Sequence, residues 1–321
     1  MSGQIEVVMN TTRGVLIDGY GPPEVLRIGR VPLPEPGYGE VQVRVHAAGI
    51  NAIDWLTRAG RGLSLSSFPA VLGWDISGTV SQIGPGVTTL KTGDQVFGMP
   101  YFPDLAGGYA DHVTAPADSL AVKPDGIPHH SAAGAPMPAL TAWQALFDVG
   151  RLSPGQRVLI HGAAGGVGHV AVQLAVNAGA EVIGTASAGN RAFVEGLGAH
   201  EVIDYSTSPV EKAARDVDMA VDPRGGQEAL RLLDVLRPGG ILVTLKGASA
   251  QLTEAARARG LRVGFVYVAP DGAALADLAA LMAVGQLRIA VENVFPLNEV
   301  SAAHMIGETG HVRGRLVLDT T

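Results

Sequence analysis

The stretch from Arg157 to Ala175 carries the residue types that could hold a diphosphate. An apolar strand is followed by a turn and then by a helix, and Gly165 and Gly166 in the turn have no Cβ, so the backbone can approach phosphate oxygens closely. Free N–H groups at the helix start, helped by the helix dipole, favour an anion there. The predicted cradle consists of Ala164, Gly165, Gly166, Val167 and Gly168, of which Gly168 lets the helix pack tightly on the strand.

The glycine pattern departs from the usual G-x-G-x-x-G, because Ala163 stands at its first position and Gly162 precedes it. The alternative interpretation is a tight strand-to-helix turn without a ligand. The preceding strand, the following helix and a further strand at residues 181–185 occur in the expected order, and this context favours a dinucleotide site.

The composition excludes several other classes of function. The chain has 321 residues, 47% hydrophobic and 17% charged, which indicates about two folded domains. A net charge of −7 without a basic run argues against a nucleic-acid partner. The absence of cysteine excludes disulfides, iron–sulfur ligation and thiolate zinc sites, and we expect no metal.

Two segments bear on location. Residues 1–12 lack the basic start and apolar core of a secretory signal. The most apolar helical segment, residues 273–284, is too short to span a bilayer. We therefore expect a cytoplasmic protein without a membrane partner.

The elements that must position the cradle fall into two groups. The first part of the chain is rich in turns and short strands, typical of a small barrel-like domain. Its predicted strands are Gly14–Asp18, Val41–Ala47, Ile76–Ile83 and Gln95–Met99. A helical pattern then covers Ser131–Val149, interrupted at its start by Pro136 and Pro138.

Strands and helices alternate after this point, which predicts an α/β, doubly wound parallel sheet. The strands are Val158–His161, Val182–Thr185, Val202–Tyr205, Met219–Asp222, Ile241–Leu245 and Val263–Val268. The helices include Val167–Asn177, Arg191–Leu197, Val210–Arg215, Gln227–Leu236 and Leu252–Arg257. A final strand, Gly314–Leu318, could return to the first domain's sheet and make that domain discontinuous.

With these landmarks in view, the chain resembles the medium-chain dehydrogenase/reductase superfamily, and within it the zinc-free quinone oxidoreductase branch that includes zeta-crystallin. Besides the glycine-rich turn, the matching segments are residues 47–54, 73–80, 93–98, 140–146, 202–205 and 311–318. The resemblance implies a Rossmann domain (residues 131–269) inserted into a GroES-like β-barrel domain (residues 1–130 and 270–321). It also implies a substrate cleft between the domains and a homodimer in which residues 263–268 pair with their copy.

Two positions depart from the zinc-using alcohol dehydrogenases of this superfamily. Those enzymes have Cys where Asn51 stands and His where Trp74 stands, and neither an amide nor an indole is a zinc ligand here. We therefore reject a zinc alcohol dehydrogenase. Trp74 either lines the substrate cleft or is a packed core aromatic.

The end of the second Rossmann strand bears on the choice of cofactor. An NAD site usually ends this strand with Asp or Glu, which binds the ribose 2′-OH, and no acid is present at residues 183–191. Ser187 and Arg191 could bind a 2′-phosphate, and Tyr205 matches a position that contacts it in relatives. We therefore expect NADPH. The alternatives are a helix cap for Ser187 and a solvated charge for Arg191.

The resemblance also implies a set of residues near the nicotinamide half. Thr141 and Asn51 are expected beside the ribose or carboxamide. The remaining members are Thr244, Leu245, Lys246, Phe265, Val266 and Tyr267. As alternatives, Phe265 and Val266 are core strand residues and Lys246 is a solvated loop charge.

The nicotinamide supplies the hydride, and the protein supplies orientation and electrostatics. Without a zinc Lewis acid, the fitting acceptors are quinones or α,β-unsaturated carbonyls, which give an enolate that needs a hydrogen-bond donor. The candidates for this catalytic role are Asn51 and Tyr101, with a turn residue and a surface tyrosine as the alternatives. We expect structural roles for Asp54 and for the histidines at positions 46, 112, 161 and 169.

Three functions remain open at this point. The first is a zinc-independent, NADPH-dependent reductase of quinones or enones. The second is an NADPH-binding protein with little turnover, in a redox-responsive or structural role. The third is a specialised biosynthetic enoyl or enone reductase, which shares its chemistry with the first.

Overall fold

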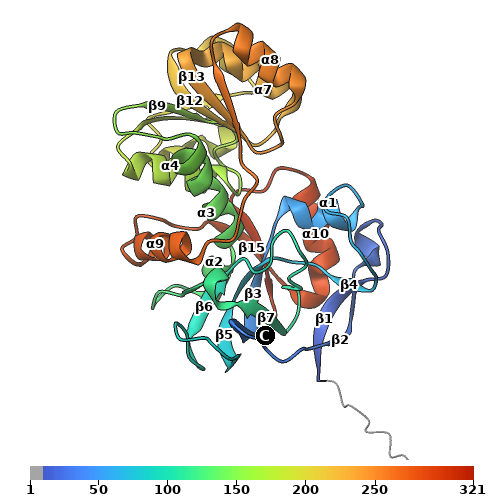
Figure 1. Ribbon diagram of the computed structural model, residues 1–321. Helices are drawn as coiled ribbons and strands as arrows, with labels where there is room; N and C mark the ends of the chain where they lie inside the picture. Colours follow the sequence, from blue (N-terminus) through green and yellow to red (C-terminus); the bar gives the residue numbers. More distant parts are fainter. Residues whose placement is uncertain (1–9) are drawn as a thin grey trace, which may run out of the picture.

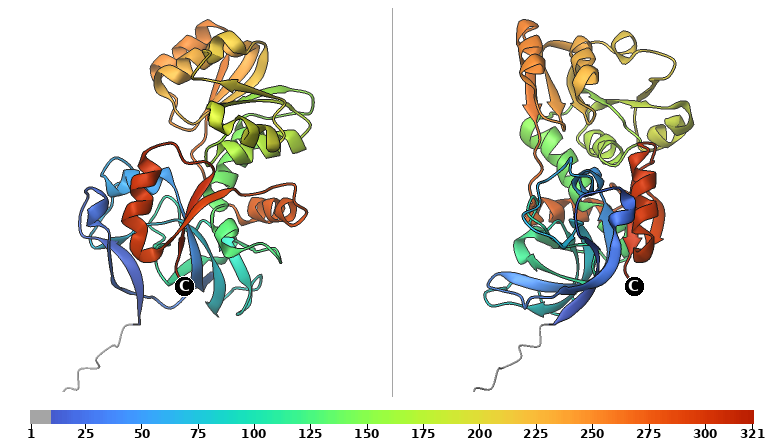
Figure 2. Two further views of the ribbon diagram at one scale, coloured as in Figure 1. Left: turned by 180° about the vertical axis from the view of Figure 1, so that it is seen from behind. Right: turned by 90° about the vertical axis from the view of Figure 1, so that its right-hand side faces the viewer.

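Two lobes, each built on its own sheet, make up the structure (Figure 1). The structure is a computed structural model that describes residues 10–321. A long helical segment joins the lobes, and the C-terminus lies in the lobe that also contains the first strands (Figures 1 and 2). The predicted architecture, a doubly wound parallel sheet inserted into a barrel-like domain, is confirmed.

The barrel lobe combines a seven-stranded and a three-stranded sheet. Side chains of a strand point alternately to its two faces, and the apolar ones pack into the core. In strand β3 (Glu40–Ile50), Val41, Val43 and Val45 are at most 2% exposed and face the core, while Arg44 is exposed. The strands are β1 (Thr11–Ile17), β2 (Arg27–Pro32), β3 (Glu40–Ile50), β4 (Ala70–Val71), β5 (Asp75–Ile83), β6 (Gln95–Gly98), β7 (His112–Pro116), β8 (Leu120–Val122), β15 (Val291–Pro296) and β16 (Arg315–Asp319).

The tail of the chain completes the barrel sheet, as the sequence predicts. Strand β16 pairs antiparallel with β3, with Leu316 opposite Ile50, and parallel with β15. Helices α1 (Ala52–Arg58) and α10 (Val300–Glu308) pack against each other beside this sheet. The exact domain limits, 1–130 with 270–321 and 131–269, stay predictions, and residues 1–9 lie outside the described part of the chain.

The second lobe is a six-stranded parallel sheet in the order β11-β10-β9-β12-β13-β14. Its strands are β9 (Arg157–Ile160), β10 (Glu181–Ala186), β11 (Glu201–Asp204), β12 (Val217–Asp222), β13 (Leu236–Thr244) and β14 (Arg262–Phe265). Its helices are α4 (Gly168–Asn177), α5 (Arg191–Gly196), α6 (Val210–Ala213), α7 (Gly226–Leu232) and α8 (Ala250–Ala258). The chain reverses its strand order between β9 and β12, which is where such sheets bind ligands.

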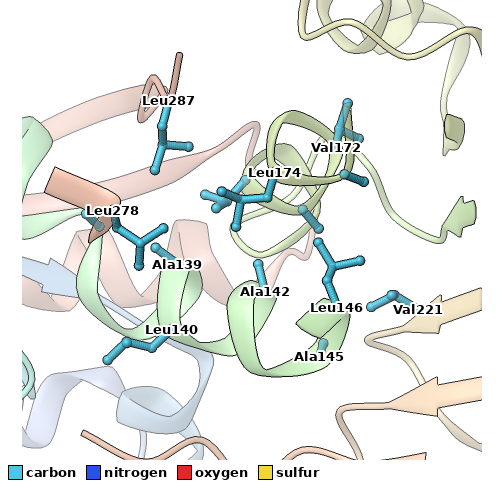
Figure 3. Packing of buried hydrophobic residues seen from close by; sticks show 14 of the residues in the cluster. Ala139, Leu140, Ala142, Ala145, Leu146, Val172, Leu174, Val221, Leu278 and Leu287 are labelled. Atoms are coloured by element: carbon cyan, nitrogen blue, oxygen red, sulfur yellow. The ribbon is translucent and has the colours of Figure 1, made fainter. Parts of the chain in front are cut away.

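Both faces of this sheet are buried. Val158 and Ile160 of β9 belong to the core that includes α4, whereas Leu159 belongs to the core under α7 and α8. The first core continues into the barrel lobe through α3 (Pro136–Trp143) and α9 (Gly272–Ala283). Figure 3 shows Leu140 and Ala142 of α3 among Val172, Leu174 and Leu278. One continuous core therefore ties the lobes together.

The helical pattern predicted over residues 131–149, with an interruption near its start, is confirmed. Helix α2 (His129–Ala133) ends before Pro136, α3 begins at Pro136, and a π-helical segment continues it over Gln144–Val149. Other predicted boundaries are wrong. The sixth Rossmann strand ends at Phe265, so Val266 and Tyr267 lie in the segment that follows it.

Candidate active site

The glycine-rich turn connects β9 to α4 at the carboxyl edge of the Rossmann sheet. Gly162 O accepts a hydrogen bond from Gly165 N at 3.0 Å, and Ala163 N donates to Thr185 O of β10 at 2.9 Å. A Cβ on Gly168 would lie 2.2 Å from Gly162 O. The predicted need for glycine at this close approach of helix and strand is therefore confirmed.

The tail of the barrel lobe packs against this turn. Gly314 N donates to Ala164 O at 2.8 Å. A Cβ on Gly166 would lie 3.1 Å from Nη1 of Arg315, so that guanidinium lies directly beside the turn. His169 also joins the two, since its Nδ1 contacts Gly165 O at 2.9 Å and its Nε2 accepts from Ala290 N at 3.3 Å.

Arg315 is the centre of a buried polar cluster where the lobes meet. Its Nη2 donates to Asn51 Oδ1 at 2.8 Å and to Asp75 Oδ2 at 3.2 Å. Asn51 Nδ2 donates to the same Asp75 oxygen at 2.9 Å, and Asp75 Oδ1 accepts from Met137 N at the start of α3 at 2.8 Å. Arg315 Nε has no partner among the described residues. The cluster thus presents a buried cation to the glycine-rich turn.

Burial sets the electrostatics of this cluster. It raises the pKa of Asp75 to about 6, although Arg315 opposes the rise, and it lowers the pKa of Arg315. Two buried charges that pair this closely gain little net stability, but removing one of them leaves the other uncompensated. The pair is therefore better explained by a need for a cation at this place than by stability.

Asp54 follows Asn51 by three residues, in the first turn of α1, and is structural, as the sequence predicts. Its Oδ2 accepts from Asn51 N at 2.5 Å, which caps the start of α1, and from the Tyr109 hydroxyl at 2.9 Å. Burial raises the pKa of Asp54 to about 7, the backbone N–H of Asn51 acting against it.

This shift gives a pH-dependent prediction. A pKa raised from 3.8 to about 7 on folding means that the stabilising contribution of Asp54 is present below pH 3.8 and is lost as the pH rises towards 7. Burial lowers the pKa values of His169 and His304 to about 4 and about 3. Their contributions to stability therefore change in the opposite direction and increase as the pH rises. We expect the stability of Asp54→Asn relative to wild type to rise by up to about 1.4 kcal/mol per pH unit across this window. Urea unfolding from pH 4 to pH 8 measures the difference, and parallel curves would contradict it.

The structure decides between the alternatives for Trp74 and places Tyr101 away from its proposed role. Trp74 is fully buried, and its indole N–H donates to Asp104 O at 2.7 Å, so it is a core aromatic rather than a cleft lining. The Tyr101 hydroxyl donates to Glu40 Oε1 at 2.5 Å. Burial and Glu40 raise the pKa of Tyr101 to about 12. This geometry does not support Tyr101 as the proton donor to a substrate, because its hydroxyl hydrogen is already donated to Glu40.

The remaining candidates of the nicotinamide half surround the carboxyl ends of β13 and β14 and the helix α3. Thr141 donates to Met137 O at 2.6 Å, and Thr244 Oγ1 accepts from Lys246 N at 3.2 Å. Val266 is buried, and its N–H donates to Thr244 O at 3.1 Å. Leu245 is half-buried, whereas Lys246, Phe265 and Tyr267 are exposed.

A cavity of about 470 Å³ opens at the carboxyl ends of β9, β11 and β12. It is lined by His161, Gly162, Tyr205, Ser206, Thr207, Ser208, Pro209, Val210, Glu211, Arg224, Glu228 and Arg231. Of the residues predicted to bind the cofactor, Tyr205 lines it. Ser187 and Arg191 do not: Ser187 Oγ accepts from Asn190 at 3.3 Å, and Arg191 pairs with Glu195 at 3.4 Å.

Sequence reasoning missed Arg315. Arg315 stands in a matched segment at the end of the chain, but only the fold brings it to the glycine-rich turn. His161, for which the sequence predicts a structural role, has its Nδ1 2.8 Å from Thr185 Oγ1. It also lines the cavity, and its Nε2 has no partner among the described residues.

Comparison with known proteins places this geometry in a family. The alcohol dehydrogenase GroES-like domain matches residues 37–125, and the zinc-binding dehydrogenase domain matches residues 197–318. The NAD(P)H oxidoreductase RTN4IP1, mitochondrial, of Danio rerio is 35% identical, over 94% of this chain and 90% of its own length. The chain belongs to the medium-chain dehydrogenase/reductase superfamily.

Solved structures agree with this membership. The quinone oxidoreductase from Coxiella burnetii has a TM-score of 0.91 and 36% identity, covering 97% of this chain and 100% of that one. The Escherichia coli quinone oxidoreductase complexed with NADPH has a TM-score of 0.86 and 28% identity, with the same coverage. The chain is thus an oxidoreductase of quinone-oxidoreductase-like type that uses a nicotinamide cofactor.

The name of one matching domain implies zinc, and the residues here do not fit it. The amide of Asn51 is engaged by Asp75 and Arg315, and the indole of Trp74 is packed in the core. Across residues 10–321 no cluster of three His, Asp or Glu side chains could hold a metal. Within the same residues, no helix has the length and apolar character needed to cross a bilayer.

Proposed function

We propose that this protein is a zinc-independent reductase that uses NADPH to transfer hydride to a quinone or an α,β-unsaturated carbonyl. One observation carries the proposal. Arg315, a buried arginine of the barrel lobe, lies against the glycine-rich turn of the Rossmann lobe. Its positive charge therefore lies beside the backbone N–H groups of the turn and the N-terminus of α4. This arrangement suits a diphosphate between two domains.

The described residues fit the cofactor. The turn would hold the diphosphate with Arg315, and the cavity beside it has a volume of about 470 Å³, enough for a nucleoside. Thr244 and Val266, with Thr141 and Asn51, would border the nicotinamide half. Bound there, the nicotinamide would supply the hydride.

Asn51 is the residue best placed to orient a reacting oxygen or the carboxamide. An amide nitrogen has two hydrogens, and Asn51 Nδ2 gives one of them to Asp75. The second remains for an oxygen acceptor, and Arg315 on the amide oxygen fixes which way the group points. A fixed donor of this kind stabilises negative charge that develops on an enolate or a hydroquinone oxygen.

The activity is tested by following the loss of NADPH absorbance with a panel of quinones and enones. We expect turnover with at least one class and none with saturated ketones, which lack an electron-poor β-carbon. Tight NADPH binding without oxidation across the panel would favour the second candidate, a binding protein with little turnover, over the reductase.

The choice of NADPH over NADH rests on the end of β10, where no carboxylate would repel a 2′-phosphate. Arg191 begins α5 just beyond this point. Hydrogen bonds from Ser206 lower the pKa of nearby Asp204, and the charge of Arg191 adds to this in the same direction. We expect Arg191→Ala to weaken NADPH binding about tenfold and to leave NADH binding nearly unchanged. Calorimetric titration with both cofactors measures this, and an equal loss for both would contradict it.

We also propose a homodimer with the β14 edge as the contact, because β14 pairs with β13 on one side and ends the described sheet. Sedimentation equilibrium distinguishes a dimer from a monomer. Cytoplasmic location stays a prediction.

A further inference from the structure

Tyr109 is a fully buried tyrosine of the barrel lobe that the proposed function does not yet use. Its hydroxyl donates to Asp54 Oδ2 at 2.9 Å, and the same oxygen accepts from Asn51 N at 2.5 Å. Hydrogen bonds to an ionised carboxylate are about twice as strong as those between neutral groups. Tyr109 therefore reaches Asn51, the proposed hydrogen-bond donor, through one carboxylate.

The surroundings of Tyr109 fix the direction of its hydroxyl hydrogen. The oxygen also lies 3.4 Å from His304 Nε2, but the shorter contact is the one to Asp54. Burial lowers the pKa of His304 to about 3, so the ring is neutral and its Nε2–H points to the Tyr109 oxygen. Arg58, which lowers the pKa of His304 further, is paired with Glu308 of α10 at 2.6 Å. The hydrogen bonds thus run from His304 through Tyr109 to Asp54.

The segment that leads to Asp75 fixes the position of the Tyr109 ring. A Cβ on Gly73 would lie 2.3 Å from Cδ1 of Tyr109, and Gly73 has a φ of +92°. Only glycine lets the ring pack at this place. Asp75 holds the side chain of Asn51, and Asp54 holds its backbone N–H. The two anchors of Asn51 are therefore connected through Tyr109 and Gly73.

The groups around Asp54 decide at which pH it is ionised. Burial raises the pKa of Asp54 to about 7, and the hydrogen bonds from Asn51 and Tyr109 oppose this rise. The charge of Asp75 adds to the rise, whereas that of Arg315 opposes it. Loss of the Tyr109 hydroxyl would therefore leave Asp54 protonated to a higher pH.

We propose that Tyr109 is a positioning residue for hydride transfer, which keeps Asp54 ionised and thereby fixes the backbone of Asn51. A protonated Asp54 is a weaker acceptor for Asn51 N, so the Asn51 amide is then held less firmly towards the reacting oxygen. The inference rests on the proposed function and adds the group that controls its hydrogen-bond donor.

The pH dependence of turnover tests this role. We expect kcat of the wild type to rise through pH 7, and Tyr109→Phe to move the midpoint of this rise up by about one unit. At pH 7 kcat of the variant is then about fivefold below wild type, and at pH 9 the two agree within a factor of about two. KM and NADPH affinity should not change. A purely structural defect would lower kcat equally at every pH.

Nuclear magnetic resonance tests the same coupling without turnover. In protein labelled with ¹⁵N-asparagine, the Asn51 backbone signal is assigned by its loss in Asn51→Ser. We expect this signal to titrate near pH 7 in the wild type, about one unit higher in Tyr109→Phe, and not at all in Asp54→Asn. The side-chain amide signal of Asn51 reports Asp75 separately, because it donates to that carboxylate.

Tyr20→Phe is the matched control. The Tyr20 hydroxyl lies in the same lobe, but it accepts from Leu65 N at 2.7 Å and does not contact Asp54. Its removal should leave the kcat profile and the Asn51 signal as in the wild type. Thermal unfolding shows whether Tyr109→Phe is folded, and if it is not, the titrations of the wild type and of Asp54→Asn decide.

Three results would overturn the inference: an Asn51 backbone signal without a transition between pH 6 and pH 8, an unmoved midpoint in Tyr109→Phe, or equal losses of kcat at pH 7 and pH 9. Failure of the proposed function is a separate result, in which no acceptor of the panel is reduced by the wild type. The Asn51 titration then still decides whether Tyr109 controls Asn51.

Discussion

Replacing Arg315 with methionine will abolish measurable NADPH binding and lower the free energy of unfolding by about 3–5 kcal/mol. The loss of stability arises because Asp75, fully buried 3.2 Å from Nη2 of Arg315, is left without its cation. The loss of binding arises because the guanidinium beside Gly166 is gone. Calorimetry with NADPH and urea unfolding measure the two effects.

A double variant separates the two effects. In Asp75→Asn/Arg315→Met both buried charges are removed, so we expect most of the lost stability to return. NADPH binding should stay absent, because no cation faces the turn. Recovery of binding together with stability would show that Arg315 supports only the fold.

Replacing Gly168 with alanine will have the second largest effect. The new Cβ would lie 2.2 Å from Gly162 O and 2.8 Å from Ala163 Cα, both backbone atoms that cannot turn aside. The helix α4 must then move away from the turn, at a cost of about 1–3 kcal/mol in stability. Because binding depends on the N-terminus of this helix, we expect NADPH affinity to fall about a hundredfold.

Gly196→Ala is the matched control for this substitution. Gly196 lies in α5 of the same lobe, and a Cβ there would meet nothing within 4 Å. Alanine at this helical position should leave NADPH affinity unchanged and raise stability by up to about 1 kcal/mol. Similar losses in both variants would show that Gly168 has no special role.

The Rossmann half could be predicted from the sequence because its signals are local. Buried apolar strands and the glycine-rich turn occur in order, and β9 begins and ends within one residue of the predicted strand. Strands such as Arg27–Pro32 were missed because most of their residues are exposed and no regular alternation of apolar and polar side chains marks them. Such edge strands depend on their pairing partner, here β1, more than on their own pattern.

The site could be predicted only where its residues are near in sequence. The turn and its helix follow from one segment, whereas Arg315, Asn51 and Asp75 come from three strands or strand ends that only the barrel brings together. Tyr101 was misplaced for a related reason. Its phenol could face a cleft by residue type, but the carboxylate of Glu40, far away in sequence, holds its hydroxyl.

The most direct test of the account is a calorimetric titration of the wild-type protein with NADPH, in parallel with Arg315→Met. The account predicts saturable binding of NADPH to the wild type and none to the variant. Absence of saturable heat from the wild type with both NADPH and NADH would contradict it.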